Sequence, residues 1–218
     1  MKAVFFDLWN TLIRPGSKKF TDCMAEAMNI EADYVLDYLR ASSSRHSDVH
    51  YKRIVHEIWG YRHGKGISRA TMKKVEVAHD QFVQSAEFIE GAVELLAGLR
   101  HQGLHVSIVS NATSVSATVV DRLGVRSMVD EVFLSCQTGY LKPDPRAFLK
   151  AAEGKAFQPN QCCVIGDKLT TDILGAKLAS MPAIWFSPDV QVVRDELCVD
   201  LVAIVNALPQ VREYIGKP

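Results

Sequence analysis

Polar side chains follow several short apolar segments of the chain, at positions where they could meet. Asp7 comes directly after the apolar run 4–6, and Ser110 and Asn111 follow the strand-like run 104–109. Short apolar runs of this kind are typical of buried strands. Because the carboxyl ends of parallel strands lie along one edge of a sheet, we expect these side chains to face a common site.

Two further carboxylates, Asp167 and Asp172, follow the apolar run 162–165. Carboxylates that face one another at close range repel unless a cation lies between them. Oxygen ligands suit Mg²⁺, which also shares its coordination shell with the phosphate group of a substrate. We therefore expect Asp7, Asp167 and Asp172 to bind magnesium.

Donors for a phosphoryl group stand beside these acids. The hydroxyl of Ser110, the amide of Asn111 and the ammonium of Lys142 would supply hydrogen bonds and positive charge. Asp7, held by a cation, could then attack phosphorus and form an aspartyl-phosphate, which splits one difficult step into two. The pattern predicts hydrolysis of a small phosphorylated molecule.

The elements that must position these residues follow an alternating pattern. Apolar runs alternate with helical patterns that end at Gly103, Gly124 and Gly154. This alternation predicts an α/β fold with a Rossmann-like parallel sheet and helices on both faces. The predicted strands are 4–6, 104–109, 132–134, 162–165 and 183–186, and the predicted helices are 92–101, 114–123, 145–153 and 171–179.

One long stretch interrupts this pattern. Between Pro15 and Glu87 the sequence contains helix-like segments and no predicted strand. These segments are 20–28, 32–39, 49–59 and 69–82. We expect residues 15–87 to form a small all-helical cap domain, and residues 1–14 and 88–218 to form the sheet-bearing core.

Composition limits the classes of partner. The 25 Lys and Arg residues balance 25 Asp and Glu residues, so no net field attracts nucleic acid. No apolar run approaches the roughly 20 residues that span a bilayer, and we expect no signal peptide before the first strand. The five cysteines lack C-x-x-C spacing, which argues against a zinc site. We predict a cytoplasmic protein acting on a small molecule.

In their order along the chain, the motifs resemble those of the haloacid dehalogenase superfamily of hydrolases. The resemblance covers the whole chain, including the insertion, which stands where family members carry a cap domain. Four segments carry it: Phe6–Asp7–Leu8–Trp9–Asn10–Thr11–Leu12, Val109–Ser110–Asn111, Leu141–Lys142–Pro143–Asp144, and Ile165–Gly166–Asp167 with Asp172.

The resemblance implies a role for each of these residues. Asp7 would be the nucleophile, while Ser110 and Lys142 would anchor the phosphate. The metal ligands would be Asp7, the backbone carbonyl of Trp9, Asp167 and Asp172. The candidate catalytic residues are Asp7, Thr11, Ser110 and Lys142, and the candidate substrate contacts are Trp9, Asn10, Ser110, Asn111 and Lys142.

The segment after Asp7 departs from the family pattern at two positions. Family phosphatases usually carry a second Asp where this chain has Trp9, and that Asp protonates the leaving group and later activates water. An indole offers one N–H donor and no acceptor, so it cannot be the base, and losing a positioned acid/base typically costs about 10² to 10⁴ in rate. Asn10 replaces the usual Gly and tolerates positive φ.

Three explanations of Trp9 stay open. In the first, the insertion supplies the proton-transfer group from His46, His50, His63 or Lys65. In the second, the substrate has a good leaving group, as an acyl or aryl phosphate does. In the third, the reaction is dehalogenation, because 2-haloacid dehalogenases resemble this chain in placing an aromatic residue there.

The dehalogenase alternative meets difficulties at other positions. Those enzymes carry Ser and Asn in the fourth motif where this chain has Gly166 and Asp167, and a Tyr where it has Phe148. Without a metal, the anionic Asp167 beside Asp7 would oppose an anionic substrate. The electrostatics favour the magnesium interpretation, and a non-catalytic protein that binds a phosphorylated ligand is a further alternative.

Overall fold

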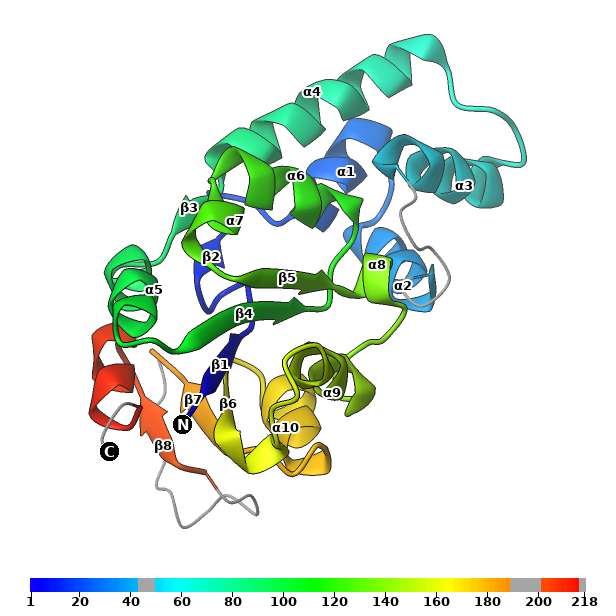
Figure 1. The fold of residues 1–218 in the computed structure, drawn as a ribbon. Helices are drawn as coiled ribbons and strands as arrows, with labels where there is room; N and C mark the ends of the chain where they lie inside the picture. The colour runs from blue at the N-terminus through cyan, green and yellow to red at the C-terminus, as the bar shows by residue number, and fades with distance from the viewer. Residues whose placement is uncertain (43–49, 189–200, 216–218) are drawn as a thin grey trace.

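A six-stranded parallel sheet forms the centre of the molecule (Figure 1). The computed structural model describes residues 1–42, 50–188 and 201–215. The strand order is β5-β4-β1-β6-β7-β8, which confirms the predicted α/β fold with a parallel sheet. The strands are β1 (Ala3–Phe6), β4 (His105–Ser110), β5 (Glu131–Leu134), β6 (Cys162–Gly166), β7 (Ala183–Phe186) and β8 (Ala203–Val205).

Helices occupy the connections that lead from β1 to β7. None of the helices in the described ranges is both long enough and apolar enough to cross a membrane. The helices of the sheet-bearing part are α5 (Ala92–His101), α6 (Ser114–Arg122), α7 (Val125–Met128), α8 (Ser135–Thr138), α9 (Arg146–Glu153) and α10 (Leu174–Leu178), with shorter turns at η1 (Pro159–Gln161), η2 (Leu169–Ile173) and η4 (Leu208–Glu213).

Both faces of β1 are buried against helices. Val4 and Phe6 belong to one apolar core, which also contains residues of α5 and α6. Ala3 and Phe5 belong to a second core, which contains residues of α9 and α10. Successive side chains of a strand point to opposite faces, so a strand covered on both sides must be apolar throughout. This explains the uninterrupted apolar run before Asp7.

The segment after β6 differs from its prediction. The predicted helix 171–179 is instead the π-helix η2 followed by the short α10. The amide of Ile173 donates to the carbonyl of Lys168 at 3.3 Å, which makes a turn wider than that of an α-helix. The wide turn brings Asp172 back beside β6, where a Cβ on Gly166 would lie only 2.4 Å from the Cβ of Asp172.

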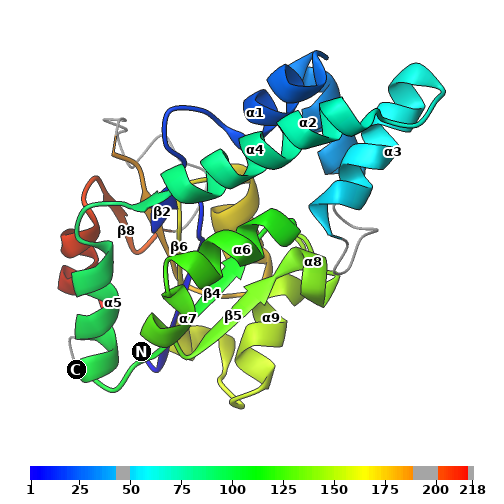
Figure 2. The same ribbon diagram turned by 90° about the horizontal axis from the view of Figure 1, so that it is seen from above.

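Between the short strands β2 (Ile13–Arg14) and β3 (Glu87–Phe88), the described residues form four helices. Figures 1 and 2 show them gathered together to one side of the sheet. The two strands pair antiparallel, so the chain leaves the sheet-bearing part and returns to it at the same place. The helices are α1 (Phe20–Met28), α2 (Ala32–Ser42), α3 (Tyr51–His63) and α4 (Arg69–Ser85). The sequence predicted no strand here, and two-residue strands are too short to show an alternating pattern.

Candidate active site

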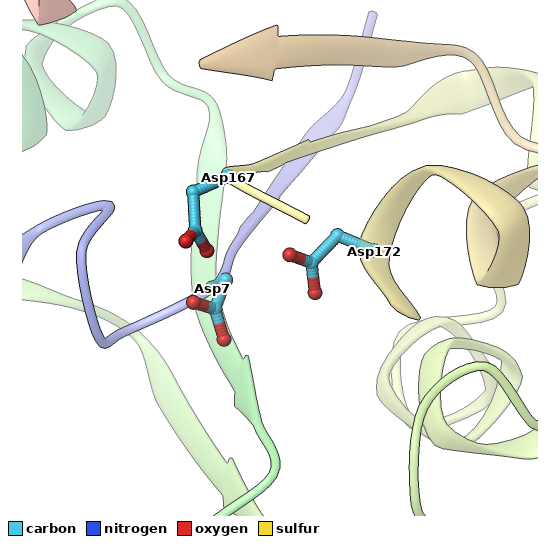
Figure 3. Close-up of side chains that lie close together, drawn as sticks. All are labelled: Asp7, Asp167 and Asp172. Carbon is cyan, nitrogen blue, oxygen red and sulfur yellow. The ribbon is translucent and has the colours of Figure 1, made fainter. Parts of the chain in front are cut away.

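Three carboxylates converge at the carboxyl ends of β1 and β6 (Figure 3). Asp7 follows β1, Asp167 follows β6, and Asp172 comes from η2. Each offers one oxygen, and these oxygens lie within 4.8 Å of one another. Asp7 and Asp172 are buried and Asp167 is half-buried. A compact set of carboxylate oxygens fits the ligand preference of Mg²⁺.

Lys142 lies among these acids. Its Nζ is 2.5 Å from Oδ1 of Asp7 and 2.7 Å from Oδ1 of Asp172. Burial lowers the pKa of Lys142, but the charges of Asp7 and Asp172 outweigh that effect and raise its pKa above the ordinary value. The ammonium therefore stays protonated. The buried ammonium of Lys142 and the exposed ammonium of Lys168, which acts on Asp167, face three carboxylates, so negative charge is in excess at the site.

The carboxyl of Asp167 reflects this imbalance. Burial raises its pKa to about 6, and the nearby charges of Asp7 and Asp172 act in the same direction. Burial also raises the pKa of Asp7, against the lowering by Lys142. A divalent cation among the three carboxylates would reverse this trend, because it stabilises their charged forms.

Asn111 holds Lys142 in place through its backbone. The amide Nδ2 donates to the carbonyl of Lys142 at 2.8 Å, and Oδ1 accepts from the Lys142 backbone N–H at 2.8 Å. This double contact joins the end of β4 to the loop that carries the lysine. One N–H of the amide is not used in the pair, so contact with a substrate phosphate stays a prediction for Asn111.

Two buried hydroxyls of the site lack partners. Ser110 is 3% exposed and Thr11 is fully buried, and neither hydroxyl oxygen has a hydrogen-bond partner among the described residues. Oδ1 of Asp167 is likewise buried and has no hydrogen-bond partner among the described residues. Buried polar atoms in folded proteins are nearly always hydrogen-bonded. Unpartnered atoms beside a carboxylate cluster are therefore suited to a ligand.

The turn after Asp7 has the geometry that the sequence predicted for Asn10. Asn10 has φ of 61°, and its backbone N–H donates to the carbonyl of Ile13 at 2.7 Å. Asp7 itself is anchored by its backbone N–H, which donates to the carbonyl of Ile165 at 2.8 Å. The left-handed residue lets the chain reverse immediately after the strand, which leaves the Asp7 side chain at the sheet edge.

Trp9 is fixed by contacts that the sequence did not reveal. Its indole N–H donates to Oγ of Ser116 at 2.9 Å, and its ring lies 5.6 Å from that of Phe82 between centroids. Ser116 belongs to α6 and Phe82 to α4, far from Trp9 in the sequence, and no local pattern signals such contacts. Trp9 also lines a cleft of about 510 Å³, together with Asn10 and Lys168.

The proton-transfer candidates from the insertion do not line this cleft in the described part of the chain. Nδ1 of His50 accepts from the backbone N–H of Lys52 at 3.3 Å, where it caps α3. The His63 ring packs 4.1 Å from that of Trp59. Lys65 is exposed and is not among the cleft residues, and His46 lies outside the described residues. The structure gives no support to the first explanation of Trp9.

Known proteins with both phosphatase and dehalogenase names resemble this chain. Glyceraldehyde 3-phosphate phosphatase of Methanothermobacter thermautotrophicus is 25% identical over 99% of this chain and 100% of its own length. A solved HAD phosphatase from Thermococcus onnurineus has a TM-score of 0.70 at 18% identity, covering 99% of this chain and 98% of that chain. A 2-haloacid dehalogenase from Pseudomonas syringae pv. Tomato DC3000 has a TM-score of 0.73 at 18% identity with the same coverage.

These two solved structures share the fold of this chain, so the fold by itself does not separate the two chemistries. The family model described as "Hydrolase: haloacid dehalogenase-like hydrolase" matches residues 1–180, well over half of the chain. It includes the first-strand motif, Ser110, Lys142 and the Gly166–Asp167 motif with Asp172. The chain belongs to the haloacid dehalogenase-like hydrolase family.

Proposed function

We propose that this chain is a magnesium-dependent phosphatase that hydrolyses a small phosphorylated molecule through an aspartyl-phosphate on Asp7. The carboxylate cluster with its one buried ammonium carries the proposal, because the three acids outnumber the cations at the point where a phosphoryl group would need positive charge. The glyceraldehyde 3-phosphate phosphatase relative, which is similar along its full length, supports a phosphate substrate.

Each polar group has a place in this proposal. Asp7, Asp167 and Asp172 would hold Mg²⁺, with the backbone carbonyl of Trp9 as a further ligand. The ion, when bound, supplies positive charge that stabilises the transferring phosphoryl group. The Ser110 hydroxyl and the Lys142 ammonium would bind phosphoryl oxygens, and Asp7 would attack phosphorus. The buried Thr11 hydroxyl, which has no hydrogen-bond partner among the described residues, stays a candidate catalytic group.

We also propose that residues 15–87 act as a cap over the core formed by residues 1–14 and 88–218. Residues of α1, α2 and α4 line the cleft beside Trp9 together with residues of α6. A cleft lined by both the insertion and the core is suited to bind the leaving group of a substrate. Closing such a cleft would also exclude water from the reaction.

A 2-haloacid dehalogenase is the second candidate, and the aromatic Trp9 favours it. In that reaction Asp7 would displace halide from carbon without a metal. The substrate is anionic, however, and it would meet three carboxylates, of which Lys142 pairs with Asp7 and Asp172 while Lys168 acts on Asp167 only from an exposed position. The phosphatase names among the relatives also support a phosphatase over a dehalogenase.

Hydrolysis of 4-nitrophenyl phosphate tests the proposal. We expect turnover with Mg²⁺, and loss of turnover in EDTA or in Asp7→Asn. Asp121→Asn is the matched control, because Asp121 is an exposed carboxylate that pairs with Arg126. Turnover that survives EDTA or Asp7→Asn would refute the proposal. Halide release from 2-chloropropionate without added metal would establish the dehalogenase instead.

A further inference from the structure

We infer, on the basis of the proposed phosphatase function, that the site favours aryl phosphates, whose leaving group departs as a stable anion on a flat ring. Two observations carry this inference. The first is the way Trp9 is held two residues after the nucleophile. The second is the apolar wall that Trp9 forms with residues of the helical insertion.

Trp9 is held from two sides. The only polar hydrogen of its side chain is donated to Oγ of Ser116 at 2.9 Å. Its ring is tilted by 37° against Phe82, which in turn lies edge-on to Phe20 with ring centroids 5.3 Å apart. This packing fixes the indole of a residue two positions after Asp7, and its N–H cannot turn toward a leaving group without breaking the bond to Ser116.

The cleft beside Trp9 has a partly apolar lining. Trp9, Phe20, Leu36 and Phe82 line it, and its volume is about 510 Å³, within the range of about 300–1,000 Å³ that small-molecule sites occupy. Aromatic rings pack favourably against one another in offset or edge-on arrangements. A planar ring on the ester oxygen of a bound phosphate would therefore be accommodated in the cleft.

The chemistry at phosphorus leads to the same class of substrate. A carboxylate oxygen of Asp7 forms a bond to phosphorus while the bond from phosphorus to the ester oxygen breaks, and the electron pair of that bond leaves on the ester oxygen. An alkoxide needs a proton as it leaves, and the Trp9 indole supplies none. A phenolate, with a pKa close to the value of about 10 for a Tyr side chain, leaves more readily without one.

The second half of the reaction releases inorganic phosphate. A water oxygen forms a bond to phosphorus, the bond between phosphorus and Asp7 breaks, and the carboxylate of Asp7 is restored. The protons of that water pass to phosphate oxygens and solvent. Trp9 has no acceptor for them, so this half also proceeds without a base at that position.

A comparison of phenyl phosphate with benzyl phosphate distinguishes the effect of the leaving group from the effect of the ring. Both carry a phenyl ring, but benzyl phosphate releases an alkoxide. With Mg²⁺ we expect kcat/KM for phenyl phosphate to exceed that for benzyl phosphate by about 10² to 10⁴, the usual effect of a positioned acid. Trp9→Asp should narrow the gap at least about tenfold by restoring an acid there, whereas Trp9→Phe should leave the gap unchanged.

Two carboxyls of the insertion, Asp22 and Asp33, also line the cleft. If either one protonated the leaving group, Asp22→Asn or Asp33→Asn would slow benzyl phosphate selectively, and that result would overturn the inference. Equal turnover of the two esters by the wild-type protein would overturn it as well. That comparison decides the question even if Trp9→Asp fails to fold.

The contribution of the ring is measured by inhibition of 4-nitrophenyl phosphate turnover. We expect benzyl phosphate to inhibit about tenfold more strongly than methyl phosphate, because only the former packs against the aromatic wall. Phe82→Leu should reduce that difference. Equal inhibition by the two esters would refute the apolar wall as a binding surface. Absence of turnover with every ester would instead count against the proposed phosphatase function.

Discussion

The Nζ of Lys142 lies 2.5 Å from Oδ1 of Asp7, and both side chains are buried. The carboxylate of Asp172 approaches the same ammonium at 2.7 Å, so one cation serves two acids. Asp167 adds a third acid to the cluster. In the proposed function, Mg²⁺ neutralises the remaining negative charge of this cluster. The same ion is needed for activity, so metal binding should affect both stability and activity.

Replacing Lys142 with Met should destabilise the protein strongly. The variant leaves Asp7 and Asp172 buried without their cation, and removing one partner of a buried ion pair typically costs about 3–5 kcal/mol. Urea denaturation in EDTA measures the change in the free energy of unfolding. Lys150→Met is the control, because it removes the same charge from an exposed ion pair, in which Nζ of Lys150 lies 3.8 Å from Oε2 of Glu153. Equal small effects of both variants would contradict the role given to Lys142.

Stability without metal should fall as the pH rises through the titration of Asp167. The pKa of Asp167 is about 6 in the folded chain, against an ordinary value of 3.8. The folded chain therefore holds this proton more tightly than the unfolded chain, so deprotonation disfavours folding between about pH 4 and pH 6. Asp167→Asn should gain stability relative to wild type across that window, as urea denaturation in EDTA measures.

The stabilisation of the folded protein by Mg²⁺ should increase as the pH rises. The ion binds the deprotonated carboxylates, so the rise in thermal midpoint caused by Mg²⁺ should be larger at about pH 7 than at about pH 5. Asp167→Asn should lose most of that rise. A rise that is independent of pH, or one that Asp167→Asn retains, would contradict the placing of the ion on this cluster.

Asn111 should affect catalysis through Lys142. Asn111→Ala removes both contacts that fix the Lys142 backbone, and a small displacement of a catalytic group can cost about 10² in rate. We expect kcat for 4-nitrophenyl phosphate to fall by about ten- to a hundredfold, while far-UV circular dichroism stays unchanged. Asn206→Ala, at an exposed position, should leave kcat at the wild-type value. A variant of Asn111 with wild-type kcat would refute this positioning role.

Gly166 should tolerate no side chain. A Cβ there would lie 2.4 Å from Cβ and 2.6 Å from Oδ2 of Asp172, so Gly166→Ala must displace Asp172 or β6. Overpacking of this kind costs about 1–3 kcal/mol, and Mg²⁺ affinity should fall as well. Gly154→Ala is the control, since a Cβ at Gly154 meets nothing within 4 Å. Equal thermal midpoints for the two variants would contradict the close approach of Asp172 to the strand.

The sequence predicted the parts of the fold that depend on local pattern. The bounds of α1, α5 and β7 agree with their predictions residue for residue, because apolar periodicity and stop signals act over a few residues. The sequence did not predict the π-helix η2. Its wide turn is associated with the close approach of Asp172 to Gly166. That approach is a tertiary contact between η2 and β6, and such a contact produces no apolar periodicity in the sequence.

The sequence also indicated which polar residues lie at the strand ends, because strand order places them on one edge. It gave no sign of the partners of Trp9. Ser116 and Phe82 come from α6 and α4, and such contacts depend on how the insertion packs on the core. The same limit applied to Asn111, whose amide holds the Lys142 backbone.

A crystal structure with Mg²⁺ and beryllium fluoride tests the central claim most directly. Beryllium fluoride mimics a phosphoryl group on a carboxylate. We predict density that joins Oδ of Asp7 to beryllium, with the metal bound by Asp7 and Asp167 and the fluorides held by Ser110 and Lys142. Beryllium fluoride bound away from Asp7, or a metal bound elsewhere, would contradict the account of Asp7 as a phosphate-accepting nucleophile.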